Sequence, residues 1–179
     1  MIILVGASAS GKTEVAKMLG KLFQMKKVIT HTTRSMREGE KDGVDYYFVS
    51  KEEFLTLKKM NFFVETTEYN DNFYGTSHKE LADNKVLIVD PNGLKSFTRL
   101  KDPRVVSFFM FATKETRRIR MLKRGDRIED AIKRIATDDQ KFNETAKETC
   151  DFLIDSEKQS IKKVALEVYE LYASKLSLM

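Results

Sequence analysis

The sequence opens with MIILVGASASGKTEV (residues 1–15), an apolar run that gives way to a loop bounded by two glycines. Residues 2–5 are all apolar, which is typical of a strand buried on both faces of a parallel sheet. The loop then reads Gly6-Ala7-Ser8-Ala9-Ser10-Gly11-Lys12-Thr13, the spacing of a phosphate-binding loop between a strand and a helix. Backbone N–H groups in such a loop, together with the helix N-terminus, favour phosphate oxygens. We therefore predict a nucleotide site at residues 6–13, with Lys12 on the β- and γ-phosphates and the Thr13 hydroxyl placed to ligate Mg²⁺.

The totals indicate one globular domain with an ordinary core: 179 residues, 41% of them hydrophobic and 33% charged. A net charge of +5 indicates an anionic partner, which nucleic acid, acidic lipid or nucleotide phosphates would all satisfy. Cys150 is the single cysteine, which excludes an internal disulfide framework and a site built from several thiolates. No apolar run approaches the roughly 18 residues of a membrane span, so we expect a cytoplasmic protein that does not bind membranes.

Apolar runs alternate with longer amphipathic stretches along most of the chain. Strands separated by helices imply right-handed crossovers, so we expect an α/β fold whose parallel sheet is flanked by helices. The further strands are predicted at residues 86–89, 105–112 and 152–155, and the helices after the glycine loop and at residues 93–101, 114–124, 128–148 and 161–172.

Residues 34–85 break this rhythm. Short strand patterns occur at 45–49, 62–69 and 73–76, with Asn70-Asp71-Asn72 as a hairpin turn. We read this as a small β-rich lobe inserted into a core made of residues 1–33 and 86–179. Because no Gly/Ser-rich linker separates the parts, we expect a single domain.

Two arginines in this insertion point to a second phosphate site. Arg34 and Arg37 lie three residues apart, and a pair of guanidinium groups grips a phosphate dianion directionally. Asp90 ends the apolar run VLIVD, where its carboxylate has two readings: a role toward Mg²⁺ or substrate, or the N-cap of a helix that begins at Pro91.

The spacing in this region resembles the guanylate kinase family, and the match covers most of the chain. The family pattern T-T-R-x-x-R-x-G-E-x-x-G-x-D-Y-x-F is met at residues 32–48. A strand glutamate follows at Glu65, and the Y-G-[ST] motif at Tyr74-Gly75-Thr76. The phosphate-binding loop precedes them at the expected distance.

The resemblance implies an ATP:GMP phosphotransferase that requires Mg²⁺, with a GMP-binding lobe and a short helical lid at about residues 120–138. Its small-molecule partners would be ATP and GMP, with dGMP, and the choice between monomer and homodimer, left open. Glu65 would accept hydrogen bonds from the guanine edge, which adenine cannot donate. The other GMP-binding residues implied are Thr30, Arg34, Arg37, Glu40, Tyr46, Tyr74, Thr76 and Asp90.

The basic stretch KETRRIRMLKRGDR (114–127) is expected to lead into the lid. By resemblance, Arg120, Arg124 and Arg134 would stabilise the charge of the transferred phosphoryl group, together with Lys12 and Arg34. The remaining basic residues of the stretch, Arg117, Arg118 and Lys123, are expected on a solvated helix face.

The loop departs from the family pattern at Ala9, where a glycine is usual; alanine has less freedom to adopt a positive φ angle. Three other functions are each consistent with part of the sequence. A ribosyl bisphosphate kinase of the same fold would not need the base-reading Glu65, and an interaction module without catalysis would not need the intact Gly11-Lys12-Thr13. A nucleic-acid binder is disfavoured, because small-molecule phosphates already account for the basic residues.

Overall fold

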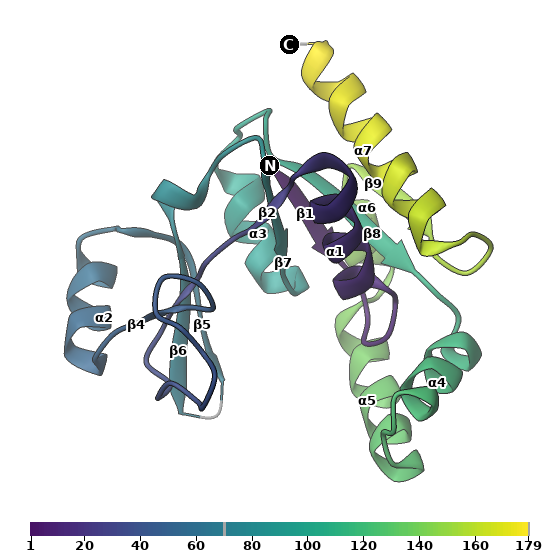
Figure 1. Ribbon diagram of the computed structural model, residues 1–179, viewed down its shortest axis with the longest axis horizontal. Helices are drawn as coiled ribbons and strands as arrows, with labels where there is room; N and C mark the ends of the chain where they lie inside the picture. The colour runs from purple at the N-terminus through teal and green to yellow at the C-terminus, as the bar shows by residue number, and fades with distance from the viewer. Residues whose placement is uncertain (70, 179) are drawn as a thin grey trace.

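The core of the computed structural model, which describes residues 1–69 and 71–178, is a five-stranded sheet (Figure 1). Every strand pair in this sheet is parallel, which confirms the predicted α/β core. The strand order is β2-β7-β1-β8-β9, so the strand that precedes the glycine loop lies at the centre. The strands are β1 (Ile2–Val5), β2 (Lys26–Lys27), β7 (Lys85–Ile88), β8 (Val106–Phe111) and β9 (Phe152–Asp155).

Helices cover both faces of this sheet. The side chains of β1 point alternately to the two faces, so each face contributes to a hydrophobic cluster. Ile2 and Leu4 pack into a cluster with α1 (Lys12–Phe23) and α7 (Ile161–Ser177). Ile3 and Val5 pack into a second cluster with α3 (Pro91–Arg99) and α6 (Glu144–Glu148). All four β1 side chains are fully buried, as the apolar run predicts. None of the described helices is both long and apolar enough to cross a membrane.

The inserted lobe is a separate four-stranded sheet in the order β4-β3-β6-β5. Its β5–β6 pair is an antiparallel hairpin, as expected, but Asn70 of the predicted turn lies outside the described residues. The sheet already includes His31 and Thr32, which pair with β6 and β4; the β-pairing therefore begins before the expected boundary at residue 34. The strands are β3 (His31–Thr32), β4 (Tyr47–Phe48), β5 (Phe63–Tyr69) and β6 (Asn72–Ser77), followed by the 3₁₀ helix η1 (His78–Glu80).

Two helical segments differ from the sequence-based expectation. Helix α2 (Lys51–Lys59) was not expected; it begins where the Ser50 side chain accepts the Glu53 N–H, and only Phe54 of this helix is buried. The single long helix predicted at 128–148 is wrong. It is divided into α5 (Ile128–Lys141) and α6, because the Asn143 side chain accepts the Ala146 N–H and starts a new helix.

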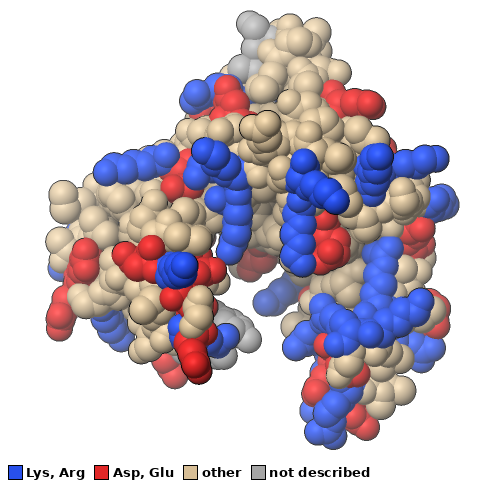
Figure 2. All heavy atoms as spheres, in the orientation of Figure 1, with Lys and Arg blue, Asp and Glu red and all other residues tan. Residues whose placement is uncertain are grey.

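Helix α4 (Lys114–Lys123) and α5 pack against each other and project from the core on the side away from the lobe (Figure 1). Figure 2 shows a hollow between the lobe and these two helices, with Lys and Arg side chains gathered along the edge of the core that faces it. The glycine loop after β1 lies at this edge of the sheet (Figure 1). The fold therefore presents the loop to a basic hollow between two projecting parts.

We expect Phe54→Ala to destabilise the lobe without loosening the core sheet. The Phe54 ring is fully buried and stacks on Phe63 and Phe73, with ring centroids 4.6 and 5.5 Å away. Truncation of a buried phenylalanine costs about 3–5 kcal/mol of unfolding free energy. Hydrogen exchange should therefore accelerate at the amides of β5 and β6 and stay slow in β1. The exposed neighbour Leu55→Ala is the matched control and should change neither; equal acceleration in β1 would contradict a separately packed lobe.

Candidate active site

The glycine loop connects β1 to the first turn of α1 and is anchored by close backbone packing. At Gly6, with φ +148°, an added Cβ would lie 2.4 Å from the Met110 carbonyl oxygen on β8, so only glycine fits. The Lys12 Nζ lies across the loop and donates to the carbonyl oxygens of Gly6 (2.6 Å) and Ala7 (2.7 Å). Burial lowers the pKa of Lys12 to about 8, and the charge of Asp138 opposes that shift. The loop backbone thus holds the Lys12 ammonium group through two carbonyl oxygens.

Ala9 adopts a positive φ angle, the conformation that alanine was expected to resist. Its φ is +60°, in the left-handed region that costs an L-residue roughly 1–2 kcal/mol. The Ala9 carbonyl accepts a hydrogen bond from Arg120 Nη1 at 3.2 Å, which helps hold the loop in this shape. The alanine therefore adopts the left-handed conformation and leaves local strain in the loop.

A cavity of about 450 Å³ opens beside the loop on its α4 side. Arg120 Nη2 donates to the Ser156 carbonyl at 2.6 Å, so this side chain bridges the loop and the segment after β9. The cavity is lined by Ala9, Gly11, Lys12, Thr13, Glu14, Arg120, Arg124 and Ile161. We call it the donor cavity, because the sequence predicts that a phosphoryl donor binds at this loop. It brings predicted loop residues together with two of the three predicted lid arginines.

The third lid arginine, Arg134, points elsewhere. Its Nη1 lies 3.3 Å from Asp126 Oδ2, and the same carboxylate binds Arg124 Nη2 at 2.6 Å. Arg134 is an exposed residue of α5 and does not line the donor cavity. Asp126 therefore holds two of the predicted catalytic arginines at the tip of the α4–α5 pair.

In the lobe, predicted phosphate-binding side chains gather around Arg34. Arg34 Nη2 pairs with Glu40 Oε1 at 2.7 Å, and its guanidinium lies over the Tyr46 ring, 5.3 Å from the centroid. The Tyr46 and Tyr74 rings are 6.1 Å apart. Arg37 differs: its backbone N–H binds Glu40 Oε2 at 2.7 Å, while the residue itself is exposed. Glu40 thus organises both arginines of the motif.

The half-buried Glu65 and the buried Thr76 form a polar pair on the neighbouring strands β5 and β6. Thr76 Oγ1 donates to Glu65 Oε1 at 2.7 Å, and Thr76 is fully buried. Burial raises the pKa of Glu65 above its usual range, and the charge of Asp90 adds to this shift, while the Thr76 hydroxyl opposes it. A carboxylate in this setting has strong reason to accept N–H donors from a ligand.

Asp90 is the N-cap of α3. Of the two roles predicted from the sequence, its contacts therefore match the helix cap. Its Oδ1 accepts the Gly93 N–H at 2.8 Å, and Pro91 takes the first turn of the helix. Its negative charge nonetheless contributes to the raised pKa of Glu65. Thr30, the remaining predicted residue on this side, lies partly buried in the segment that leads into β3.

Comparison with known proteins decides the family. The family model described as Guanylate kinase matches residues 1–171. This chain belongs to the guanylate kinase family.

Guanylate kinases of several bacteria are similar to this chain over most of its length. The guanylate kinase of Anaplasma phagocytophilum is 38% identical over 136 residues, which cover 70% of this chain and 65% of that relative. That of Campylobacter jejuni is 33% identical over 172 residues, 89% of this chain and 83% of the relative. The crystal structure of the Anaplasma guanylate kinase superposes with a TM-score of 0.65 at 30% identity, covering 97% of this chain and 85% of that one.

Two other similarities are narrower. MAGUK p55 subfamily member 7 of Xenopus tropicalis is 40% identical over 103 residues, 53% of this chain but only 18% of that protein. A shikimate kinase of Acinetobacter baumannii superposes with a TM-score of 0.54 at 13% identity, covering 97% of this chain and 92% of that one, and shows a shared fold alone. Neither changes the assignment to the guanylate kinase family.

One side chain of the basic stretch lies where the sequence did not place it. Arg117 is buried, not on a solvated face: its Nη1 lies 3.4 Å from Asp138 Oδ2 and its Nη2 3.0 Å from Asp139 Oδ1. The helical period explains the error, since Arg117 precedes the buried Met121 by one turn and shares its face of α4.

Sequence reasoning also missed Asp138, whose Oδ2 accepts the Ser8 N–H of the glycine loop at 2.7 Å. A signal for it exists: Asp138 follows Arg134 by four residues, so the two lie on one face of α5.

We expect Ala9→Gly to stabilise the protein by about 0.5–1 kcal/mol, because relief of the left-handed strain exceeds the greater freedom of glycine in the unfolded chain. Ala7→Gly is the matched control, since the backbone of Ala7 is not left-handed, and should give no gain. Urea unfolding of the three proteins measures both effects. A gain from Ala7→Gly equal to that from Ala9→Gly would contradict this account.

Glu65→Gln should stabilise the fold at neutral pH, with a gain that depends on pH. A carboxyl whose pKa is raised by folding contributes stability at low pH and loses it as pH rises through the raised pKa. Glutamine keeps the oxygen that accepts the Thr76 hydroxyl and removes the buried charge. The difference in unfolding free energy should therefore grow from about pH 4 toward pH 7. Glu68→Gln, an exposed position on the same strand, should show no such growth.

Proposed function

We propose that this chain transfers the γ-phosphate of ATP to GMP, giving ADP and GDP, as the names of its relatives suggest. The observation that supports this best is the hydrogen-bonded Glu65–Thr76 pair, which lies in the same lobe as the group formed by Arg34, Tyr46 and Tyr74. Together they offer a carboxylate acceptor for a guanine edge and several donors for a phosphate dianion. A ribosyl acceptor would offer the Glu65 carboxylate none of the N–H donors of a guanine edge.

The donor would enter through the donor cavity. Its triphosphate would lie on the N–H groups at the start of α1, with the Lys12 ammonium able to exchange its carbonyl partners for phosphate oxygens. Arg120 already bridges the loop and the segment after β9, so it is placed to fix the walls around the nucleotide. The negative charge of the triphosphate would be neutralised in the donor cavity by Lys12, Arg120 and Arg124.

The acceptor needs no general base, because a GMP phosphate oxygen is already ionised at neutral pH. Catalysis then depends on position and charge neutralisation. Arg34 and Arg37 would hold the acceptor phosphate and Arg134 would be recruited when the lid closes. We propose that the lobe of about residues 34–85 and the lid of about residues 120–138 approach each other across the hollow of Figure 2 and exclude water.

Mg²⁺ fits this site as an ion that is carried by the nucleotide. The Thr13 hydroxyl lines the donor cavity next to Lys12, and no group of three or more His, Cys, Asp or Glu side chains that could hold a metal occurs in the described part of the chain. Mg²⁺ commonly takes most of its ligands from phosphates and water. When bound, it would neutralise charge on the β- and γ-phosphates. A cytoplasmic location stays a prediction.

An ADP-release assay with Mg-ATP and GMP, AMP, CMP, UMP or ribose 1,5-bisphosphate tests this function. We expect turnover with GMP, reduced by about 100-fold or more in Lys12→Met, because the transferred charge loses its main cation. Glu65→Gln should weaken kcat/KM for GMP by about 100-fold and leave the low rate with AMP unchanged.

Lys17→Met is the matched control: Lys17 is on the same helix but exposed and paired with Glu14, and this variant should retain full activity. Turnover with ribose 1,5-bisphosphate in preference to GMP would overturn the choice of acceptor. Folded wild-type protein that turns over no acceptor would favour a binding module instead.

A further inference from the structure

A carboxylate of the lid occupies part of the phosphate-binding loop. Asp138 lies near the end of α5, is nearly buried, and accepts the Ser8 N–H at 2.7 Å through Oδ2. The two residues are 130 positions apart in the sequence, so the contact is a product of the tertiary fold. Loop N–H groups of this kind favour anions, and a buried carboxylate is an anion.

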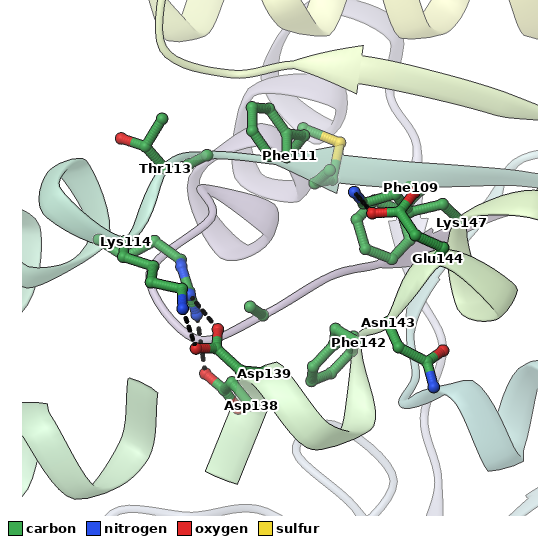
Figure 3. Close-up of a pocket in the computed structure, with 14 residues that line it drawn as sticks. Phe109, Phe111, Thr113, Lys114, Asp138, Asp139, Phe142, Asn143, Glu144 and Lys147 are labelled. Atoms are coloured by element: carbon green, nitrogen blue, oxygen red, sulfur yellow. Dashed lines mark hydrogen bonds and ion pairs between the residues drawn. The ribbon is translucent and has the colours of Figure 1, made fainter. Parts of the chain in front are cut away.

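The same carboxylate belongs to a charged cluster that joins both lid helices. Arg117 of α4 binds Asp138 and Asp139 together, and Asp139 Oδ2 pairs with Lys114 Nζ at 2.7 Å. Figure 3 shows Asp138 and Asp139 side by side near Lys114, with these ion pairs dashed. Only Asp138 of the two acidic residues reaches the loop. Asp139 therefore provides an internal comparison with Asp138. It has the same charge and the same arginine partner, but it does not contact the loop.

The position of Asp138 along the loop indicates which phosphate it would meet. The donor cavity is lined by Ala9 and Gly11–Thr13, whereas Ser8 and Asp138 do not line it. Asp138 instead lines the cavity of Figure 3, on the other side of the loop, together with Ala7. A triphosphate that enters from the donor cavity therefore reaches the helix N-terminus first and Ser8 last. The terminal phosphate is the one that competes for the Ser8 N–H.

We propose that Asp138 makes the site discriminate between ATP and ADP: its carboxylate holds the Ser8 N–H when no terminal phosphate is present and is displaced by that phosphate when ATP binds. This inference rests on the proposed function only in assuming that ATP binds at the loop. ATP binding must break the contact and bring two negative groups close to Lys12, while ADP binding leaves the contact in place. After transfer of the terminal phosphate the contact re-forms, which favours the ADP-bound state.

Displacement of Asp138 from the Ser8 N–H would also affect the lid helices. Asp138 and Arg134 lie on one face of α5, and Arg117 ties that helix to α4. A carboxylate that leaves the loop therefore changes the position of the helix that carries Arg134. Asp138 acts in this scheme as a positioning residue that senses the terminal phosphate, and Arg134 is the group that would meet it.

Calorimetric binding of Mg-ADP and of a non-hydrolysable Mg-ATP analogue tests the proposal without GMP. In Asp138→Asn the acceptor oxygen remains but the repulsion is lost, so the ATP analogue should bind about five- to tenfold tighter, with ADP affinity unchanged. Asp139→Asn, the matched control, should alter neither affinity. Equal changes for both nucleotides in Asp138→Asn, or no change, would overturn the proposal, because a merely structural ion pair cannot distinguish them.

The Ser8 amide resonance of the wild-type protein gives a second readout that does not depend on how a variant folds. It should shift on addition of the ATP analogue and stay near its ligand-free position with ADP. The same shift with both nucleotides would contradict the exchange. Wild-type protein that binds neither nucleotide would refute the proposed donor site itself, whereas normal binding without selectivity in Asp138→Asn refutes only the role of Asp138.

Discussion

The contact between Gly6 and the Met110 carbonyl on β8 is the constraint on which the site depends. Because a Cβ at Gly6 would lie 2.4 Å from that oxygen, the chain leaving β1 must turn sharply against its neighbouring strand. That turn sets the start of α1 and therefore the direction of its N–H groups. The donor cavity on one side of the loop and the cavity of Figure 3 on the other follow from the same turn.

Five of the basic residues expected to meet phosphates already have partners for their side chains. Arg34 is held by Glu40, Arg124 and Arg134 by Asp126, and Arg120 and Lys12 by backbone carbonyls. Exposed ion pairs contribute little to stability, so exchanging a carboxylate for a phosphate at Arg124 or Arg134 is an easy step. Asp138 is different because it is buried between a guanidinium and the loop, where a change of partner has larger consequences.

The lobe treats its carboxylate differently. The half-buried Glu65 has the Thr76 hydroxyl as its partner, no ion pair with it is found among the described residues, and burial raises its pKa. Such a group reduces the stability of the ligand-free lobe and gains most from a ligand that supplies N–H donors. The proposed function therefore couples stability and base selectivity at one side chain of β5. That side chain lies in a lobe whose own aromatic core of Phe54, Phe63 and Phe73 packs apart from the main sheet.

Local patterns of the sequence determined the parallel core, the glycine loop, the lobe and the family, because periodicity, glycine spacing and motif order are properties of neighbouring residues. Two misses were local: α2 and the break at Asn143 are set by N-caps, Ser50 and Asn143, that the hydrophobic pattern alone does not reveal. Arg117 is different, because it is buried where its helix face meets α5. The contact between Ser8 and Asp138 was beyond reach for the same reason. No local rule relates residues 130 positions apart, and only the packing of α5 against the loop brings a carboxylate to an N–H that otherwise favours phosphate.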